Sequence, residues 1–195
     1  MKKDIILAGV GGQGIISIAS IIGYAALKKG MFLKQAEVHG MSQRGGDVQS
    51  NLRISDNEIY SDLIPLGKAD LILAVEPLES LRYLPFLSPE GWLITSLNPF
   101  NNVPNYPDVE KITDEIRALP HRVALDADTL AKEAGSIKAA NIVVLGAASP
   151  FLEIEYEILE EAIRAFFSKK GDKLIQTNLD ALKSGRNFTD KQLKA

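Results

Sequence analysis

The chain has 195 residues, of which 46% are hydrophobic and 24% are charged, so we expect one domain with a substantial buried core. Its formal net charge is −3, from 22 basic and 25 acidic residues, which lacks the basic excess typical of nucleic-acid binding. The sequence contains no cysteine, which excludes disulfides, a cysteine nucleophile and an iron–sulfur cluster held by thiolates of this chain.

The N-terminal residues resemble a signal peptide only in part. Lys2 and Lys3 precede an apolar stretch, but Asp4 stands between them and a glycine-rich turn ends the stretch. No A-x-A cleavage site follows. We therefore expect neither a signal peptide nor a membrane anchor, and we expect a cytoplasmic protein.

Short apolar runs alternate along the chain with longer segments of helical periodicity. We expect strands at residues 4–10, 31–38, 48–54, 70–75, 91–95 and 122–125. We expect helices within residues 11–30, near 78–87, and at 112–119, 126–134, 139–148, 153–170 and 173–183, before a polar tail. Asp56 and Asn57 favour a hairpin toward Ile59 and Tyr60, and residues 98–108 should form an irregular loop. This order predicts one α/β domain over residues 1–195, with a three-layer α/β/α, Rossmann-like fold around a mainly parallel, mixed sheet.

A glycine-rich turn follows the first expected strand. The stretch ILAGVGGQGI places Gly9, Gly11 and Gly14 in the G-x-G-x-x-G spacing. In this context the glycines allow a tight exit from the strand, the approach of a phosphate, and close packing of the helix. Gly12 and Gln13 add a flexible position and a polar side chain, beside helix N–H groups that attract anions. The alternative is a close strand–helix junction that binds nothing.

Several other residues bear on whether the turn belongs to a dehydrogenase. Glu37 follows the turn at about the distance of the acidic residue that binds ribose in dinucleotide folds. Tyr24 and Lys28 form a Y-x-x-x-K pair, which we interpret as incidental because both lie on the first helix, beyond the turn. His39 and His121 are the only histidines and have no matching carboxylates nearby, so we expect no metal site.

A second polar stretch, EVHGMSQRGGDVQSNLRI, contains a loop that could bind a ligand. The loop brings Ser42, Gln43, Arg44 and Gly45 into close order. An arginine beside glycines can hold a phosphate or carboxylate through two hydrogen bonds, and surface loops of this kind often carry function. The alternative is a solvated turn.

Together, the G-x-G-G-Q-G turn, E-V-H-G-M-S-Q-R-G-G and the following S-x-L-R strand resemble the gamma subunit, or domain III, of the 2-oxoacid:ferredoxin oxidoreductases. The resemblance covers most of the chain and includes AANIVVLGA at residues 139–147, which is similar to a buried helix of the family. Among these enzymes the chain is most similar to the small beta subunits of those that oxidise indolepyruvate. It departs from the family at Asn51, where related domains often have histidine, so we carry over no polar role for that position.

The resemblance implies a division of labour between two subunits. A larger, alpha-type partner would carry thiamine diphosphate, Mg²⁺ and 4Fe-4S clusters, decarboxylate the 2-oxoacid and pass electrons to ferredoxin. The small subunit would pack beside that active site and help to receive coenzyme A, so that an arylpyruvate becomes an aryl-acetyl-CoA. The sequence agrees, because it has no cysteine and no Gly-Asp-Gly motif followed by an Asn pair.

We therefore predict an oxidoreductase subunit that is inactive alone and contributes no catalytic residue and no metal ligand. Its expected binding residues are Gly9, Gly11, Gly12, Gln13 and Gly14, with Ser42, Gln43, Arg44 and Gly45 facing the partner. Two alternatives stay open: a self-contained NAD(P)-binding reductase, and a non-catalytic nucleotide-binding interaction module with an apolar surface patch. The 2-oxoacid and the stoichiometry also stay open.

Overall fold

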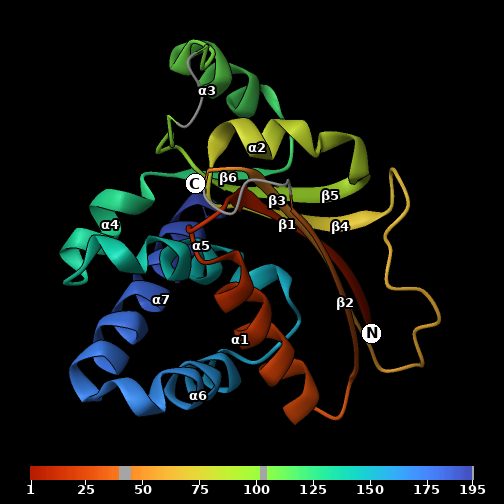
Figure 1. Ribbon diagram of the computed structural model, residues 1–195, viewed down its shortest axis with the longest axis vertical. Coiled ribbons are helices and arrows are strands. Elements are labelled where there is room, and N and C mark those ends of the chain that lie inside the picture. The colour runs from red at the N-terminus through yellow and green to blue at the C-terminus, as the bar shows by residue number, and fades with distance from the viewer. Residues whose placement is uncertain (40–44, 102–104, 195) are drawn as a thin grey trace.

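The computed structural model describes residues 1–39, 45–101 and 105–194. Within these residues, six strands form one sheet in the order β2-β3-β1-β4-β5-β6 (Figure 1). Strands β1, β4, β5 and β6 are parallel to one another, whereas β3 is antiparallel to both of its neighbours, which confirms a mainly parallel, mixed sheet. The strands are β1 (Lys2–Val10), β2 (Phe32–His39), β3 (Asp47–Ser55), β4 (Ala69–Ala74), β5 (Leu87–Ser96) and β6 (Arg122–Leu125).

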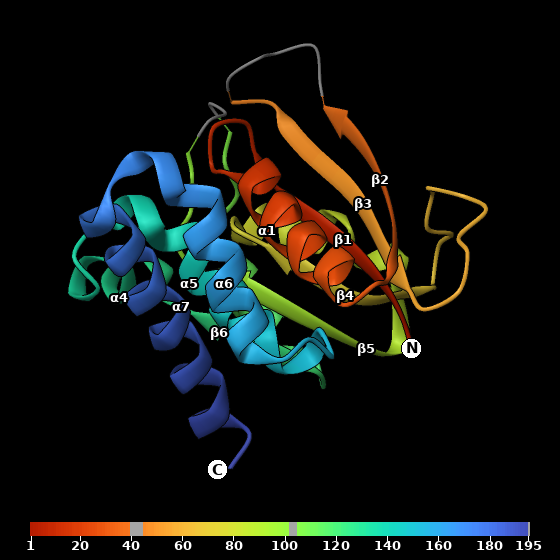
Figure 2. The ribbon, with the colours of Figure 1, turned by 90° about the horizontal axis from the view of Figure 1, so that it is seen from below.

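Helices cover both faces of the sheet, which confirms the three-layer architecture (Figures 1 and 2). Helices α2 and α3 lie over one face; α1 and α5 lie over the other, where α6 packs on α1 and α7 packs on α5. The α-helices of the described residues are α1 (Ile15–Lys28), α2 (Pro77–Arg82), α3 (Val109–Ala118), α4 (Ala127–Glu133), α5 (Ala140–Ala148), α6 (Tyr156–Phe167) and α7 (Asp172–Gln192). Short 3₁₀ helices lie at η1 (Leu84–Phe86), η2 (Ile137–Ala139), η3 (Ser149–Phe151) and η4 (Ser168–Lys170). None of the described helices is both long enough and apolar enough to cross a membrane.

Strand β1 is buried on both faces, as its continuous apolar run predicts. Ile5 and Leu7 belong to the larger core, which the sheet forms with α1, α5, α6 and α7. Ile6 and Ala8 point to the opposite face and belong to the core formed with α2 and α3. The strand that precedes the glycine turn is therefore fixed from both sides.

The prediction of a hairpin at Asp56 and Asn57 is wrong. Strand β3 pairs with β2 along one edge and with β1 along the other, so that Leu52 lies opposite both Gln35 and Ile5. Because both edges of β3 are occupied, the residues that follow Ser55 find no free edge to pair with. Residues 56–68 instead run outside the sheet to β4 without forming a helix or strand.

Helix α7 extends to Gln192, where the sequence predicted a polar tail after residue 183. Two tertiary hydrogen bonds hold its last turns. The hydroxyl of Thr189 donates to the carbonyl oxygen of Ala147 at 2.9 Å, and the Gln192 amide donates to that of Arg122 at 2.8 Å. Tertiary contacts thus determine the helix end, which local composition does not indicate.

Candidate functional site

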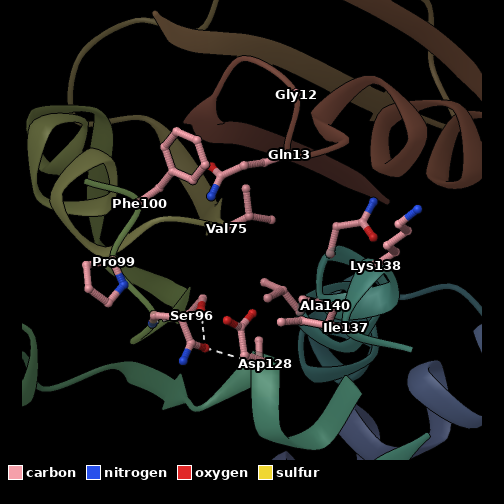
Figure 3. Close-up of a pocket in the computed structure, with 14 residues that line it drawn as sticks. Gly12, Gln13, Val75, Ser96, Pro99, Phe100, Asp128, Ile137, Lys138 and Ala140 are labelled. Atoms are coloured by element: carbon pink, nitrogen blue, oxygen red, sulfur yellow. Dashed lines mark hydrogen bonds between the residues drawn. The ribbon is translucent and has the colours of Figure 1, made fainter. Parts of the chain in front are cut away.

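A cavity of about 470 Å³ lies where the carboxyl ends of β1, β4, β5 and β6 meet (Figure 3). Ligands of open α/β sheets bind at this edge because the loops that follow the strands converge there. The cavity is lined by Gly12, Gln13, Val75, Ser96, Asn98, Pro99, Phe100, Ala127, Asp128, Ile137, Lys138, Ala140, Asn141 and Val144. A second cavity of about 260 Å³ shares Gly12, Gln13, Lys138 and Asn141 with the first. The glycine turn therefore borders both hollows.

The glycines of the turn have different structural roles. A Cβ atom at Gly9 would lie 2.5 Å from Cγ2 of Val75, so close packing between β1 and the end of β4 requires glycine there. Gly14 has φ +83°, and a Cβ atom would overlap the side-chain amide of Asn141. Gly12 has φ +102° and open space around its Cβ position. Gly12 thus leaves its backbone accessible from both hollows.

The backbone N–H groups of the turn divide into bonded and unbonded sets. The Gly11 N–H donates to the carbonyl oxygen of Gly46 at 2.8 Å, and the Gln13 N–H donates to that of Val10 at 3.1 Å. Among the described residues, the N–H groups of Gly12 and Gly14 have no acceptor. Gly14 is also the N-cap of α1, so the positive end of the helix dipole adds to these free donors. The arrangement can bind an anion.

Gln13 closes the turn and forms part of the cavity wall. Its Oε1 accepts the N–H of Val10 at 2.8 Å, which fixes the side chain across the turn. Figure 3 shows the Gln13 amide beside the ring of Phe100, above Val75. An amide and an aromatic ring on one wall can contact a polar group and a planar apolar group of the same ligand.

A hydrogen-bonded cluster forms the opposite wall. Oδ1 of Asn98 accepts the Ser96 hydroxyl at 2.9 Å and the Asp128 N–H at 3.0 Å. The amide of Asn98 donates to Asp126 at 2.9 Å, and Asp126 also accepts the N–H of Thr129 at 3.0 Å. The Thr129 N–H, together with the Asn98 amide, holds the pKa of Asp126 below its usual range. Hydrogen bonds thus fix this polar wall, and the Asp126 carboxylate behind it is ionised at neutral pH.

Glu76 is a buried carboxylate behind the cavity, with only 1% of its surface exposed. Its Oε2 accepts the N–H of Glu79 at 2.8 Å and so caps α2. Its Oε1 accepts the Phe100 N–H at 3.2 Å and the hydroxyl of Tyr106. Burial, followed by the hydrogen bond to Glu76, raises the pKa of Tyr106. Glu76 thus fixes the segment that places Phe100 in the cavity wall.

Residues 4–188 match the pyruvate ferredoxin/flavodoxin oxidoreductase family. The chain belongs to this family. The indolepyruvate oxidoreductase subunit IorB of Archaeoglobus fulgidus is 38% identical over 198 residues, covering 96% of this chain and 95% of that protein. These matches confirm the resemblance inferred from the two motifs and place the chain among oxidoreductase subunits.

Two solved structures are similar to this chain. The gamma subunit of a keto/oxoacid ferredoxin oxidoreductase from Geobacter sulfurreducens is 26% identical, with a TM-score of 0.70, over 99% of both chains. The 2-oxoglutarate:ferredoxin oxidoreductase from Magnetococcus marinus, solved with 2-oxoglutarate, coenzyme A and succinyl-CoA bound, has a TM-score of 0.78 at 24% identity. That match covers 100% of this chain and 32% of the other. The family fold thus occurs both as a separate subunit and within a longer chain.

The C-terminal end of the second family motif, at Gly45 and Gly46, lies next to the glycine turn. Ser42, Gln43 and Arg44 fall outside the described residues. Gly45 is described and has φ +79°, and the adjacent Gly46 accepts the N–H of Gly11. The base of the 39–47 loop is therefore bonded to the turn, although Gly11 and Gly46 are 35 positions apart in sequence.

The residues that suggested a dehydrogenase lie away from the turn. Because β3 lies between β1 and β2, Glu37 is opposite Ser50, which is itself opposite Leu7 of β1. At about 4.8 Å per strand, Glu37 lies roughly 10 Å from Leu7 of β1, whereas the acidic residue of a dinucleotide fold lies on the strand next to β1. Lys28, at the far end of α1, forms an ion pair with Glu161. The family's strand order thus leaves no dinucleotide geometry at Glu37.

Several wall residues were not predicted from the sequence. Phe100 and Asn98 lie in the predicted irregular loop, Lys138 directly precedes the predicted apolar helix, and Asn141 lies in its first turn. The Glu-Pro pair at Glu76, directly after the strand predicted at residues 70–75, is a capping signal that marks the start of a helix at this edge. Such a signal could have identified the carboxyl edge of the sheet as the site, but not which side chains there face the cavity. The described residues contain no group of three or more acidic or histidine side chains that could hold a metal ion.

Proposed function

We propose that this chain is the small subunit of an indolepyruvate:ferredoxin oxidoreductase, formed as one domain over residues 1–195 and located in the cytoplasm. The observation that carries the proposal is the cavity at the carboxyl edge of the sheet, with free N–H groups at the glycine turn. The identity of 38% over almost the whole length of an indolepyruvate oxidoreductase subunit supports the choice of substrate.

We propose that the turn and the two hollows receive part of coenzyme A. The diphosphate would accept hydrogen bonds from the N–H groups of Gly12 and Gly14 and would approach the ammonium of Lys138, which lines both hollows. Gly9, Gly11 and Gln13 would hold the turn in shape. A cavity of about 470 Å³ is within the usual range for small-molecule sites.

The larger partner would supply the redox chemistry. Thiamine diphosphate provides an electron sink for decarboxylation, and 4Fe-4S clusters carry the electrons onward to ferredoxin. This chain has no cysteine, so its residues do not fit a cluster held by thiolates. Its own contribution would be to bind and orient coenzyme A beside the partner's active site. Ser42, Gln43, Arg44 and Gly45 would face that active site.

The test is isolation of the native complex through a tag on this chain, followed by activity assays. We expect a brown complex with a larger, thiamine-diphosphate-containing subunit, and reduction of ferredoxin that requires both indolepyruvate and coenzyme A. Faster turnover with pyruvate or 2-oxoglutarate would contradict the substrate assignment. Isolation of this chain without any partner would contradict the proposed role, and binding of NADH by the isolated chain would favour the reductase alternative.

The role of the second loop has a separate test. Arg44→Ala in the assembled enzyme should raise the KM for coenzyme A, because the substitution removes a group that can bind a phosphate through two hydrogen bonds. The KM for indolepyruvate should not change. Equal KM values for coenzyme A in the variant and the wild type would exclude this role of Arg44.

A further inference from the structure

The segment between β3 and β4 exposes a cluster of large apolar side chains. Tyr60 is 85% exposed, Leu63 56% and Leu66 65%, and all three lie within seven consecutive residues. In both ribbon views the segment lies on the side of the molecule farthest from α4 and α7 (Figures 1 and 2). Clustered exposed apolar side chains, unlike isolated ones, mark sites of protein interaction.

The backbone of this segment is held firmly despite the absence of regular structure. The guanidinium of Arg53 donates to the carbonyl oxygens of Ser61 at 3.0 Å and of Leu63 at 3.1 Å. Oδ1 of Asn51 accepts the N–H of Ile64 at 3.1 Å, and the Ile64 side chain is buried. Asn51 thus holds this segment. A fixed backbone lowers the entropy cost of binding through the side chains that it displays.

Arg53 is itself fixed by a buried carboxylate. The carboxylate of Asp4, which is 1% exposed, accepts a hydrogen bond from Nε of Arg53 at 2.7 Å. It accepts a second from a terminal nitrogen of the same guanidinium at 3.1 Å. The other terminal nitrogen of the guanidinium donates to the carbonyl oxygens of both Ser61 and Leu63. A paired arginine in this planar geometry has little freedom to move. The strands β1 and β3 therefore determine where Leu63 is displayed.

The charges beside the cluster indicate which kind of partner can cover it. Glu58 and Asp62 border Tyr60 in sequence and Lys68 follows Leu66, and none of the three forms an ion pair within the described part of the chain. A two-fold contact centred on Tyr60 would bring the carboxylates of both copies together, which costs free energy. A different chain with basic side chains around an apolar depression would complement them.

We propose that Tyr60, Leu63 and Leu66 anchor the larger subunit through such a depression rimmed by lysine or arginine. The inference rests on the proposed function, because it takes the larger subunit as the partner. These three side chains, which we call the anchor, follow the Ser55 end of β3, whereas the 39–47 loop precedes the Asp47 end. A partner that contacts both would run along β3 for roughly 27 Å. The anchor is therefore separate from the coenzyme A cavity.

Titration of the purified larger subunit into the purified chain tests the anchor. Leu63→Ser and Leu66→Ser should each weaken binding by about tenfold or more, since central apolar residues dominate interface energies. The matched control is Leu27→Ser on α1, because Leu27 is 59% exposed and lies on another surface. The control should bind within about twofold of the wild type. Asp62→Lys should also weaken binding and should make it less dependent on salt, because the local charge of Glu58 is then offset.

The outcomes separate the two proposals. If the wild-type chain binds no larger subunit, the proposed function fails. If the wild type binds but the anchor variants bind as tightly as Leu27→Ser, only the anchor is overturned. Self-association of the wild-type chain that Leu63→Ser abolishes would also overturn it, because the cluster would then join two copies. Circular dichroism and thermal unfolding should be unchanged in all variants, since every substituted side chain is exposed.

Discussion

The unbonded N–H groups beside Gly12 and Gly14 are the residue-scale feature on which the account depends. From the spacing of the glycines, the sequence predicted a turn similar to those that bind phosphate. It did not predict that the N–H of Gly11 is already bonded to Gly46, because that contact joins two segments distant in sequence. The sequence also did not predict that the side chain of Asn141 in α5, and not strand β1, lies closest to the Cβ position of Gly14. Spacing identifies such a turn, but only tertiary contacts decide which of its donors stay free.

Alanine substitutions should distinguish the two glycines that have positive φ. Gly14→Ala should destabilise the protein by about 2–3 kcal/mol, since it combines backbone strain with displacement of Asn141. Gly12→Ala should cost about 1–2 kcal/mol, because only strain applies where the Cβ position is open. Urea unfolding measures both values. Equal losses, or no coupling between Gly14→Ala and Asn141→Ala in a double-mutant cycle, would contradict the proposed contact.

The buried hydroxyl of Tyr83 predicts a loss of stability at alkaline pH. Burial, and then the negative charge of Asp47, raises the pKa of Tyr83 to about 12. Between pH 10 and about 12 the unfolded state therefore releases a proton that the folded state keeps, so stability falls as pH rises. The loss should reach about 1 kcal/mol by pH 11.

Tyr83→Phe provides the comparison, because it removes only the hydroxyl, which lies 3.3 Å from Asp47. The variant should show a flatter decline in the free energy of unfolding between pH 9 and pH 11. A decline as steep as that of the wild type would show that Tyr83 does not cause it.

At the scale of elements, the close packing of α5 against α7 is the feature that most constrains the helical layer. A Cβ atom at Gly146 would overlap the backbone of Leu182, and one at Gly185 would overlap the backbone of Val143. The apolar run AANIVVLGA predicted a buried helix at α5. The sequence did not indicate that α7 would approach it so closely, because Gly185 lies in a polar stretch.

Gly185→Ala should therefore destabilise the protein by more than about 3 kcal/mol, since neither backbone can move without shifting a helix. Gly23→Ala in α1 is the matched control. Its Cβ atom would lie 3.1 Å from the end of the flexible Leu33 side chain, and alanine improves helix propensity by up to about 1 kcal/mol. Thermal unfolding should show a large drop for the first variant and a small change for the second. Similar melting temperatures would contradict direct backbone contact between α5 and α7.

At the scale of the whole molecule, the order of strands separates what the sequence predicted from what it could not. Apolar runs and their spacing predicted each strand and the layered α/β/α fold. The insertion of β3 between β1 and β2 was not predicted, because pairing of distant segments leaves no local signal. That insertion moves Glu37 away from the turn, brings Gly46 to Gly11, and leaves residues 56–68 outside the sheet. The same topology therefore accounts for the absence of dinucleotide geometry at Glu37 and for the positions of the proposed coenzyme A site and the proposed anchor residues.

The central claim is that this chain supplies phosphate-binding groups to a coenzyme A site that a larger subunit completes. Steady-state kinetics of the assembled enzyme carrying Lys138→Met tests it most directly, with Lys132→Met as the control because Lys132 lines neither hollow. We predict that the KM for coenzyme A rises about tenfold in Lys138→Met, as expected for loss of one charged contact. The kcat and the KM for indolepyruvate should stay unchanged, and the control should match the wild type. A KM for coenzyme A that is the same in Lys138→Met and the wild type would contradict the claim.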